Sequence, residues 1–129
     1  MRTKLIRLIL ILVGAIHLYP GIGIFSAARL QQLYGIVIED RNLLLLMRHR
    51  ALLFGLFGAL LILSAFQPSL RWFAYVAGII STAGFLLLVG MAQDYNEVLR
   101  RVVIADWVAV SLLLLAILFD FVERRNLKA

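Results

Sequence analysis

The residues of this sequence that could do chemistry are a basic triplet and a few titratable side chains set among apolar stretches. Arg48, His49 and Arg50 stand between two such stretches, residues 43–47 and the sixteen uncharged residues 51–66. Guanidinium groups bind carboxylates and phosphates, and carboxylates and histidines move protons. The side chains that could act with the triplet are His17, Asp94, Glu97, Arg101 and Asp106.

The composition predicts an integral membrane protein. Of 129 residues, 64% are hydrophobic and 16% are charged, and the mean hydropathy is +0.99. Apolar runs of this length do not fit an ordinary soluble core. The lack of cysteines excludes thiolate catalysis and disulfides, and two histidines are too few for a His-only metal centre, so we expect no metal and no cofactor. The basic residues flank the apolar runs, which favours contact with anionic lipid and excludes nucleic acid as a partner.

The apolar runs predict an all-α chain, an antiparallel four-helix transmembrane bundle that forms one domain over residues 1–129. Residues 43–66 read as one helix of about 36 Å, slightly more than the hydrocarbon core of a bilayer. The first helix is ended or kinked by Pro20 and Gly21, and a short amphipathic helix in the first loop ends at Gly35. The predicted spans are 4–19, 43–66, 70–94 and 99–122, with the amphipathic segment at 25–34.

Four spans place both termini on one side of the membrane. Seven Lys and Arg residues fall on that side with two acids, and six fall on the other side with five acids. The less neutralised bases favour cytoplasmic termini for a multi-pass protein of the cell (inner) membrane. Counting Lys and Arg alone, the difference between the two sides is small.

The helical rise puts several polar groups in one layer. At 1.5 Å per residue, Arg50, Asp106 and His17 lie about 24, 22 and 18 Å from the terminal side of the membrane. Asp94 and Glu97 lie a turn or two farther out. This layer predicts a polar pocket in the half of the bundle opposite the termini, covered by segment 25–34.

Each member of the layer also has a structural reading. Asp106 could form an ion pair with Arg48 or Arg50 that locks the second and fourth spans together. The two arginines are about 200° apart around a helix, so one faces the interior and the other extends towards lipid phosphate. His17 could be a hydrogen-bonded packing residue, and His49 an interfacial one.

The pair Asp94 and Glu97 likewise has two interpretations. Their spacing of three residues suits an acid–base pair on one helix. A solvated hairpin in which they face Arg100 and Arg101 explains them equally well. Both interpretations stay open at the level of sequence.

The order of features resembles a family of small bacterial membrane proteins of unknown function, loosely grouped with the DoxX-like four-helix proteins. The matching segments are residues 14–20, 33–36 and 48–55, in the first half of the chain. The resemblance implies a four-helix bundle and a role in membrane-associated redox or small-molecule handling. It transfers no catalytic residue, and the lack of cysteines argues against a thiol-dependent version of that role.

Three functions compete at this point. The first is a binding protein whose pocket holds a lipid-like or anionic amphiphilic ligand, or a partner's helix. The second is a membrane-embedded enzyme that uses carboxylate and histidine acid–base chemistry on a lipophilic substrate. The third is a small proton- or ion-coupled transporter subunit. We prefer the first, with membrane lipid, a lipophilic small molecule and a second copy of the chain (a homo-oligomer) as partners.

Overall fold

The computed structural model describes residues 2–92 and 94–126, and this part of the chain is helical without any strand. Within the described residues, four helical segments are long and apolar enough to cross a membrane, which confirms the predicted number of long apolar helices. Two short elements join them, the helix α2 (Ala27–Tyr34) and the 3-10 turn η2 (Pro68–Leu70). The long elements are α1 (Arg2–Leu18) with its 3-10 continuation η1 (Tyr19–Ile24), α3 (Arg41–Phe66), α4 (Arg71–Met91) and α5 (Glu97–Asn126).

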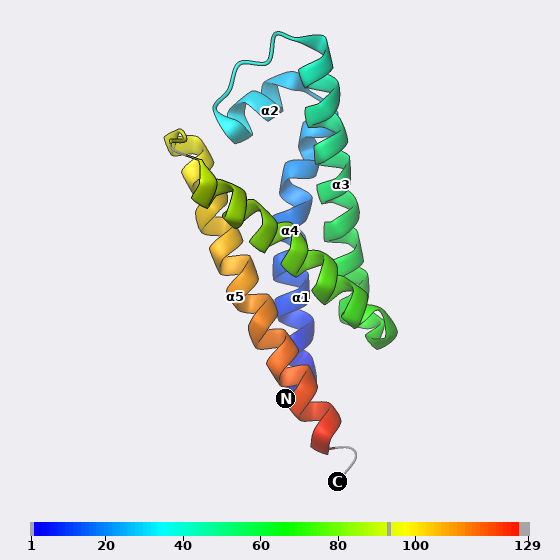
Figure 1. The fold of residues 1–129 in the computed structure, drawn as a ribbon. Helices are drawn as coiled ribbons and strands as arrows, with labels where there is room; N and C mark the ends of the chain where they lie inside the picture. Colours follow the sequence, from blue (N-terminus) through cyan, green and yellow to red (C-terminus); the bar gives the residue numbers. More distant parts are fainter. Residues whose placement is uncertain (1, 93, 127–129) are drawn as a thin grey trace.

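Figure 1 shows how the elements share the two ends of the molecule. Both termini and the turn between α3 and α4 lie at one end, which we call the terminal end. The helix α2 and the connection between α4 and α5 lie at the other, which we call the distal end. The helix α1 packs against α3 and α5, and α4 packs against the same two helices.

Two groups of buried apolar side chains hold these elements together. The larger group joins α1, α3, α4 and α5 and includes Leu10, Leu61 and Leu113. The smaller group seats Leu30 and Tyr34 of α2 against α3 and α5. The spacing of its apolar residues predicted an amphipathic helix that either lies on the bilayer surface or caps the bundle, and the structure packs it onto the distal end.

The seam between α1 and α3 depends on a close approach of two backbones. A Cβ atom added to Gly58 would lie 2.7 Å from the carbonyl oxygen of Gly14 and 2.7 Å from the backbone nitrogen of Leu18. No side chain fits in that space, so glycine lets α1 lie directly on α3. This contact helps to set the position of the His17 side chain in the last turn of α1.

Most helix ends follow local rules, and several differ from the predicted ends. Asp40 accepts a hydrogen bond of 2.7 Å from the Leu43 nitrogen and so caps α3. Gly35 ends α2 with a φ of +66°, as predicted. The α-helix α1 ends at Leu18, one residue before the predicted end, and the chain continues as the 3-10 element η1 with Pro20 near its start. Gly21 and Gly23 of η1 pack closely against α3 and α2.

The predicted end of the third span was wrong. The helix α4 ends at Met91, and Asp94 lies outside any helix. The predicted polar hairpin includes Gln93, which lies outside the described residues. Asn96 caps the next helix by accepting 2.7 Å from the Leu99 nitrogen, so α5 begins at Glu97, two residues earlier than predicted. It also runs to Asn126, four residues farther than predicted.

Candidate functional site

A pocket in the distal half of the molecule could hold a ligand. It has a volume of about 650 Å³ and lies between α1 and α5, below α2, with Phe54 of α3 in its wall. Apolar side chains make most of its surface. Of the predicted site residues, it brings together His17, Arg101 and Asp106. We call it the distal pocket.

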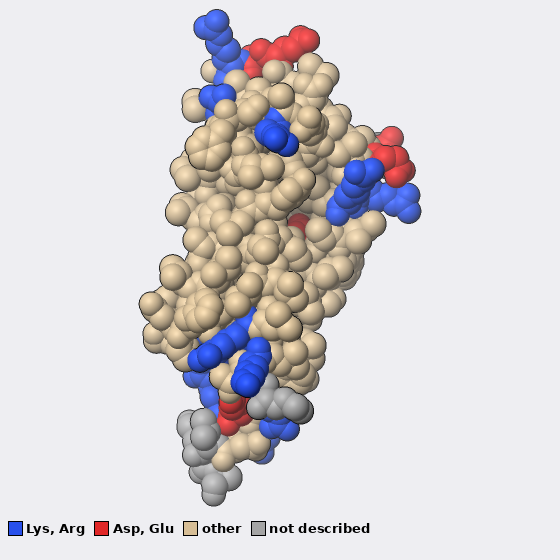
Figure 2. Space-filling view, turned by 180° about the vertical axis from the view of Figure 1, so that it is seen from behind, with Lys and Arg blue, Asp and Glu red and all other residues tan. Residues whose placement is uncertain are grey.

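Asp106 is the buried acid of this pocket. Its side chain is 5% exposed, and within the described part of the chain it forms no hydrogen bond and no ion pair. Figure 2 shows one acidic side chain recessed in a hollow between the charged groups of the two ends. A carboxylate that the fold leaves unpaired is available to a ligand.

His17 lies in the same pocket and is 2% exposed. Its Nδ1 atom lies 3.0 Å from the carbonyl oxygen of Val13, so Nδ1 carries the proton and donates it to that oxygen. In the neutral ring the Nε2 atom is then an acceptor, and it has no partner among the described residues. The ring also packs against Phe54, at a centroid distance of 5.9 Å. His17 therefore has both a packing role and one unused polar atom.

The predicted ion pair between Asp106 and an arginine of the second span is absent from the described residues. Arg50 packs instead on three aromatic rings, with its guanidinium carbon 4.9 Å from the centroid of Tyr34, 5.2 Å from that of Phe54 and 5.6 Å from that of Phe85. The attraction between a cation and the π faces takes the place of the pair. Arg48 is exposed, so of the two arginines Arg50 faces the interior.

Tyr34 lies near the charged groups of Arg50 and Asp106. It lies on α2, outside the four candidate spans, and burial raises the pKa of its hydroxyl. The positive charge of Arg50 lowers that pKa, and the negative charge of Asp106 raises it. The hydroxyl has no hydrogen-bond partner among the described residues, and Tyr34 lines the distal pocket.

The remaining predicted site residues lie outside the distal pocket. His49 is exposed on the outer face of α3. Glu97 is exposed and pairs with Arg100 at 3.4 Å, which supports the solvated interpretation of this region. Asp94 lies before α5, so the two acids do not share a helix as an acid–base pair would. Asp94 lines a separate cavity of about 550 Å³ together with Arg50.

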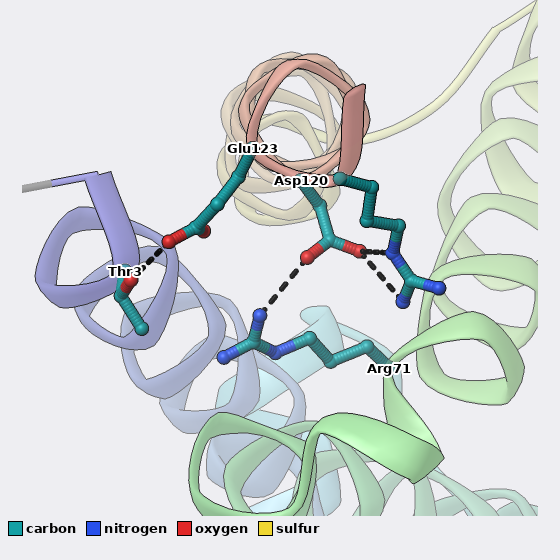
Figure 3. Close-up of polar contacts among 5 residues, drawn as sticks. Thr3, Arg71, Asp120 and Glu123 are labelled. Carbon is teal, nitrogen blue, oxygen red and sulfur yellow. Dashed lines mark hydrogen bonds and ion pairs between the residues drawn. The ribbon is translucent and has the colours of Figure 1, made fainter. Parts of the chain in front are cut away.

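The sequence analysis missed a charged cluster at the terminal end. Arg71 donates from Nη1 to Oδ1 of Asp120 at 2.9 Å, and both residues are buried. The second oxygen of Asp120 accepts from Arg124 at 3.1 Å, and Thr3 donates to Glu123 beside them. Figure 3 shows Arg71 of α4 and Asp120 of α5 pointing at each other. The four-residue spacing of Asp120 and Arg124 was the available signal.

The chemistry open to the distal pocket is binding and proton transfer. Nowhere in residues 2–92 and 94–126 do three His, Asp or Glu side chains meet as they would around a metal ion. The polar groups that line the pocket are the carboxylate of Asp106, the imidazole acceptor of His17 and the phenol of Tyr34, with the exposed side chains of Tyr19, Gln32 and Arg101. These groups suit a molecule that is mostly apolar and polar at one end.

No family model, no curated protein and no solved structure matches this chain in the three comparisons that we made. The resemblance to the DoxX-like proteins therefore stays a prediction. The function has to be argued from the geometry of the site.

Proposed function

We propose that this chain is a multi-pass protein of the bacterial inner membrane, folded as an antiparallel four-helix bundle. Its four helices long enough to span a bilayer and the exposed apolar side chains along them support this proposal. Aromatic side chains such as Trp72, which is 64% exposed near the terminal end, suit the membrane interface. The bases near the termini favour a cytoplasmic location for both ends.

The proposed function is the binding of a lipid-like amphiphile in the distal pocket. The observation that carries it is the combination of mostly apolar walls, about 650 Å³ of space and a buried carboxylate with no partner in the described chain. An unpaired charge beside a cavity does not stabilise the fold, so this arrangement supports a role in ligand binding. The volume is within the range of small-molecule sites.

The order of side chains along α5 supports one orientation of the ligand. Arg101 and Leu112 both line the pocket and are 11 residues apart, which corresponds to about 16 Å along the helix. The exposed guanidinium of Arg101 suits an acidic head group at the distal edge. The apolar end of the ligand then extends past Asp106 towards Leu12 and Leu112. The carboxylate of Asp106 then accepts a hydrogen bond from a hydroxyl group near the head, and the phenol of Tyr34 donates one to a hydroxyl or carbonyl oxygen.

Native mass spectrometry of gently purified protein tests the proposal. We expect one bound amphiphile on the wild type, released when the protein is transferred to harsher detergent. The substitution Ala15→Phe places a ring in the pocket and should abolish this bound mass. Ala59→Phe, at an exposed position of α3 that does not line the pocket, is the matched control and should keep it. A wild type without any bound mass, or equal loss from both variants, would contradict the proposal.

Acid–base catalysis on a lipophilic substrate is the second candidate, because His17 and Asp106 line one pocket. The two side chains do not hydrogen-bond to each other, so a substrate would have to join them. Turnover of the bound amphiphile that is lost in both His17→Gln and Asp106→Asn would favour the enzyme. Transport has less support, because a continuous apolar core separates the distal pocket from the terminal end.

A further inference from the structure

A third cavity lies at the terminal end, among the charged residues that the proposed function does not use. It has a volume of about 520 Å³, and α1, η2, α4 and α5 all contribute to its wall. Arg7, Arg71 and Arg124 line it together with Asp120 and Glu123. We call it the terminal pocket. Figure 2 shows basic side chains gathered at this end of the molecule.

Arg71 is the centre of the terminal pocket and is not fully satisfied. It is 4% exposed, and only its Nη1 atom has an acceptor, Asp120. The Nε and Nη2 atoms are buried and have no partner in the described part of the chain. A buried donor without an acceptor costs about 1–3 kcal/mol, so such a group indicates an acceptor that belongs to another molecule.

The neighbouring carboxylates cannot supply that acceptor as they are placed. Asp120 already accepts from both Arg71 and Arg124. Glu123 points towards α1 and accepts from Thr3 (Figure 3). Three guanidinium groups thus share the pocket with two carboxylates, and one positive charge remains. The missing partner is an anion with several acceptor oxygens.

We propose that the terminal pocket binds a phosphate group, and that this group is the head-group phosphate of an anionic phospholipid. Guanidinium forks match phosphate oxygens with two parallel hydrogen bonds, which would use the free nitrogens of Arg71 after a small side-chain shift. Arg7 is exposed at the edge of the pocket and adds a second cation. Trp72 lines the same pocket and is mostly exposed, so it can lie beside the glycerol and upper acyl chain.

Titration of delipidated protein with phosphatidylglycerol, followed by native mass spectrometry, tests this site. We expect one phosphatidylglycerol to bind at low concentration, and phosphatidylcholine to bind about fivefold more weakly because its choline group adds a positive charge. Arg7→Gln should weaken phosphatidylglycerol binding about fivefold, the effect of one charge-assisted contact. Arg71→Lys should weaken it more, because lysine lacks the fork.

Arg125→Gln is the matched control, because it removes one positive charge from an exposed position at the same end that does not line the pocket. It should change the affinity less than about twofold. Equal losses in Arg7→Gln and Arg125→Gln would reduce the effect to general surface charge and overturn the site. Equal affinity for phosphatidylglycerol and phosphatidylcholine would overturn the site as well, because a pocket with an unneutralised guanidinium group should prefer the anionic lipid.

Two further measurements show whether the phosphate belongs to a lipid or to a soluble anion, and which of the two pockets binds the lipid. Displacement of phosphatidylglycerol by millimolar inorganic phosphate would assign a soluble anion to the pocket and overturn the lipid assignment. Ala15→Phe, which blocks the distal pocket, should leave phosphatidylglycerol binding unchanged. A loss of phosphatidylglycerol in that variant would show that the lipid binds at the distal pocket instead.

Discussion

The two ends of the molecule each hold a buried carboxylate, and they treat it in opposite ways. At the terminal end, Asp120 accepts from Arg71 at 2.9 Å and from Arg124 at 3.1 Å. At the distal end, Asp106 has no partner among the described residues, and Arg50 packs on aromatic rings. Charge neutralisation is therefore complete at one carboxylate and left open at the other.

This difference indicates that the two carboxylates have different roles. A carboxylate that accepts from two guanidinium groups holds α4 and α5 together and is no longer available to other molecules. An unpaired carboxylate beside a cavity does little for the fold but can select a ligand. We expect stability to depend on Asp120 and binding to depend on Asp106.

The largest effect should follow from Asp120→Asn. This change leaves Arg71 buried with a neutral partner, and breaking a buried ion pair costs about 3–5 kcal/mol of unfolding free energy. Reversible unfolding in mixed micelles measures the loss. The double variant Arg71→Met with Asp120→Leu removes both charges and should recover most of it. A loss below about 1 kcal/mol in Asp120→Asn would mean that the terminal cluster does not hold the fold.

The apolar patterns and turn residues were enough to predict the four long apolar helices and the short helix α2. Gly35, Asp40 and Pro68 mark element ends through backbone rules that act locally, so sequence alone reveals them. The end of α4 could not be predicted, because Ala92, Asp94 and Tyr95 carry no strong breaker. Only the capping of α5 by Asn96 shows where the next helix begins.

The site was predicted in part, and the reason is geometric. Counting residues along a helix gives the depth of a side chain, so the common layer of His17 and Asp106 was found from the sequence. The rotation of each helix about its axis and the tilt between neighbouring helices decide which side chains touch. Neither can be read from a single sequence. Asp106 and Arg50 share a depth without pairing, whereas Arg71 and Asp120, which the sequence analysis only counted among terminal charges, form the real ion pair.

A smaller effect should distinguish the two arginines of the triplet. Arg50→Gln removes the contacts with Tyr34, Phe54 and Phe85, and we expect a loss of about 1–2 kcal/mol of unfolding free energy. Arg48→Gln, at an exposed position two residues earlier, should change it by less than about 0.5 kcal/mol. Equal losses in the two variants would show that cation–π packing does not order the distal end.

A small change in stability, and the sharpest change in function, should follow from Asp106→Asn. The side chain forms no hydrogen bond or ion pair in the described structure, so its charge contributes little to the fold. We expect the unfolding free energy to change by less than about 1 kcal/mol, or to rise, because a buried unpaired charge is removed. Binding of the amphiphile should be lost or weakened, since asparagine changes the hydrogen-bonding pattern at the pocket surface while keeping its volume.

Asp106→Asn and Asp120→Asn, measured in the same micelles, form a matched test of the two ends. If Asp106→Asn lowers the unfolding free energy as much as Asp120→Asn does, the distal carboxylate is structural. The ion pair between Asp106 and an arginine of α3, which the sequence predicted, would then form in the membrane.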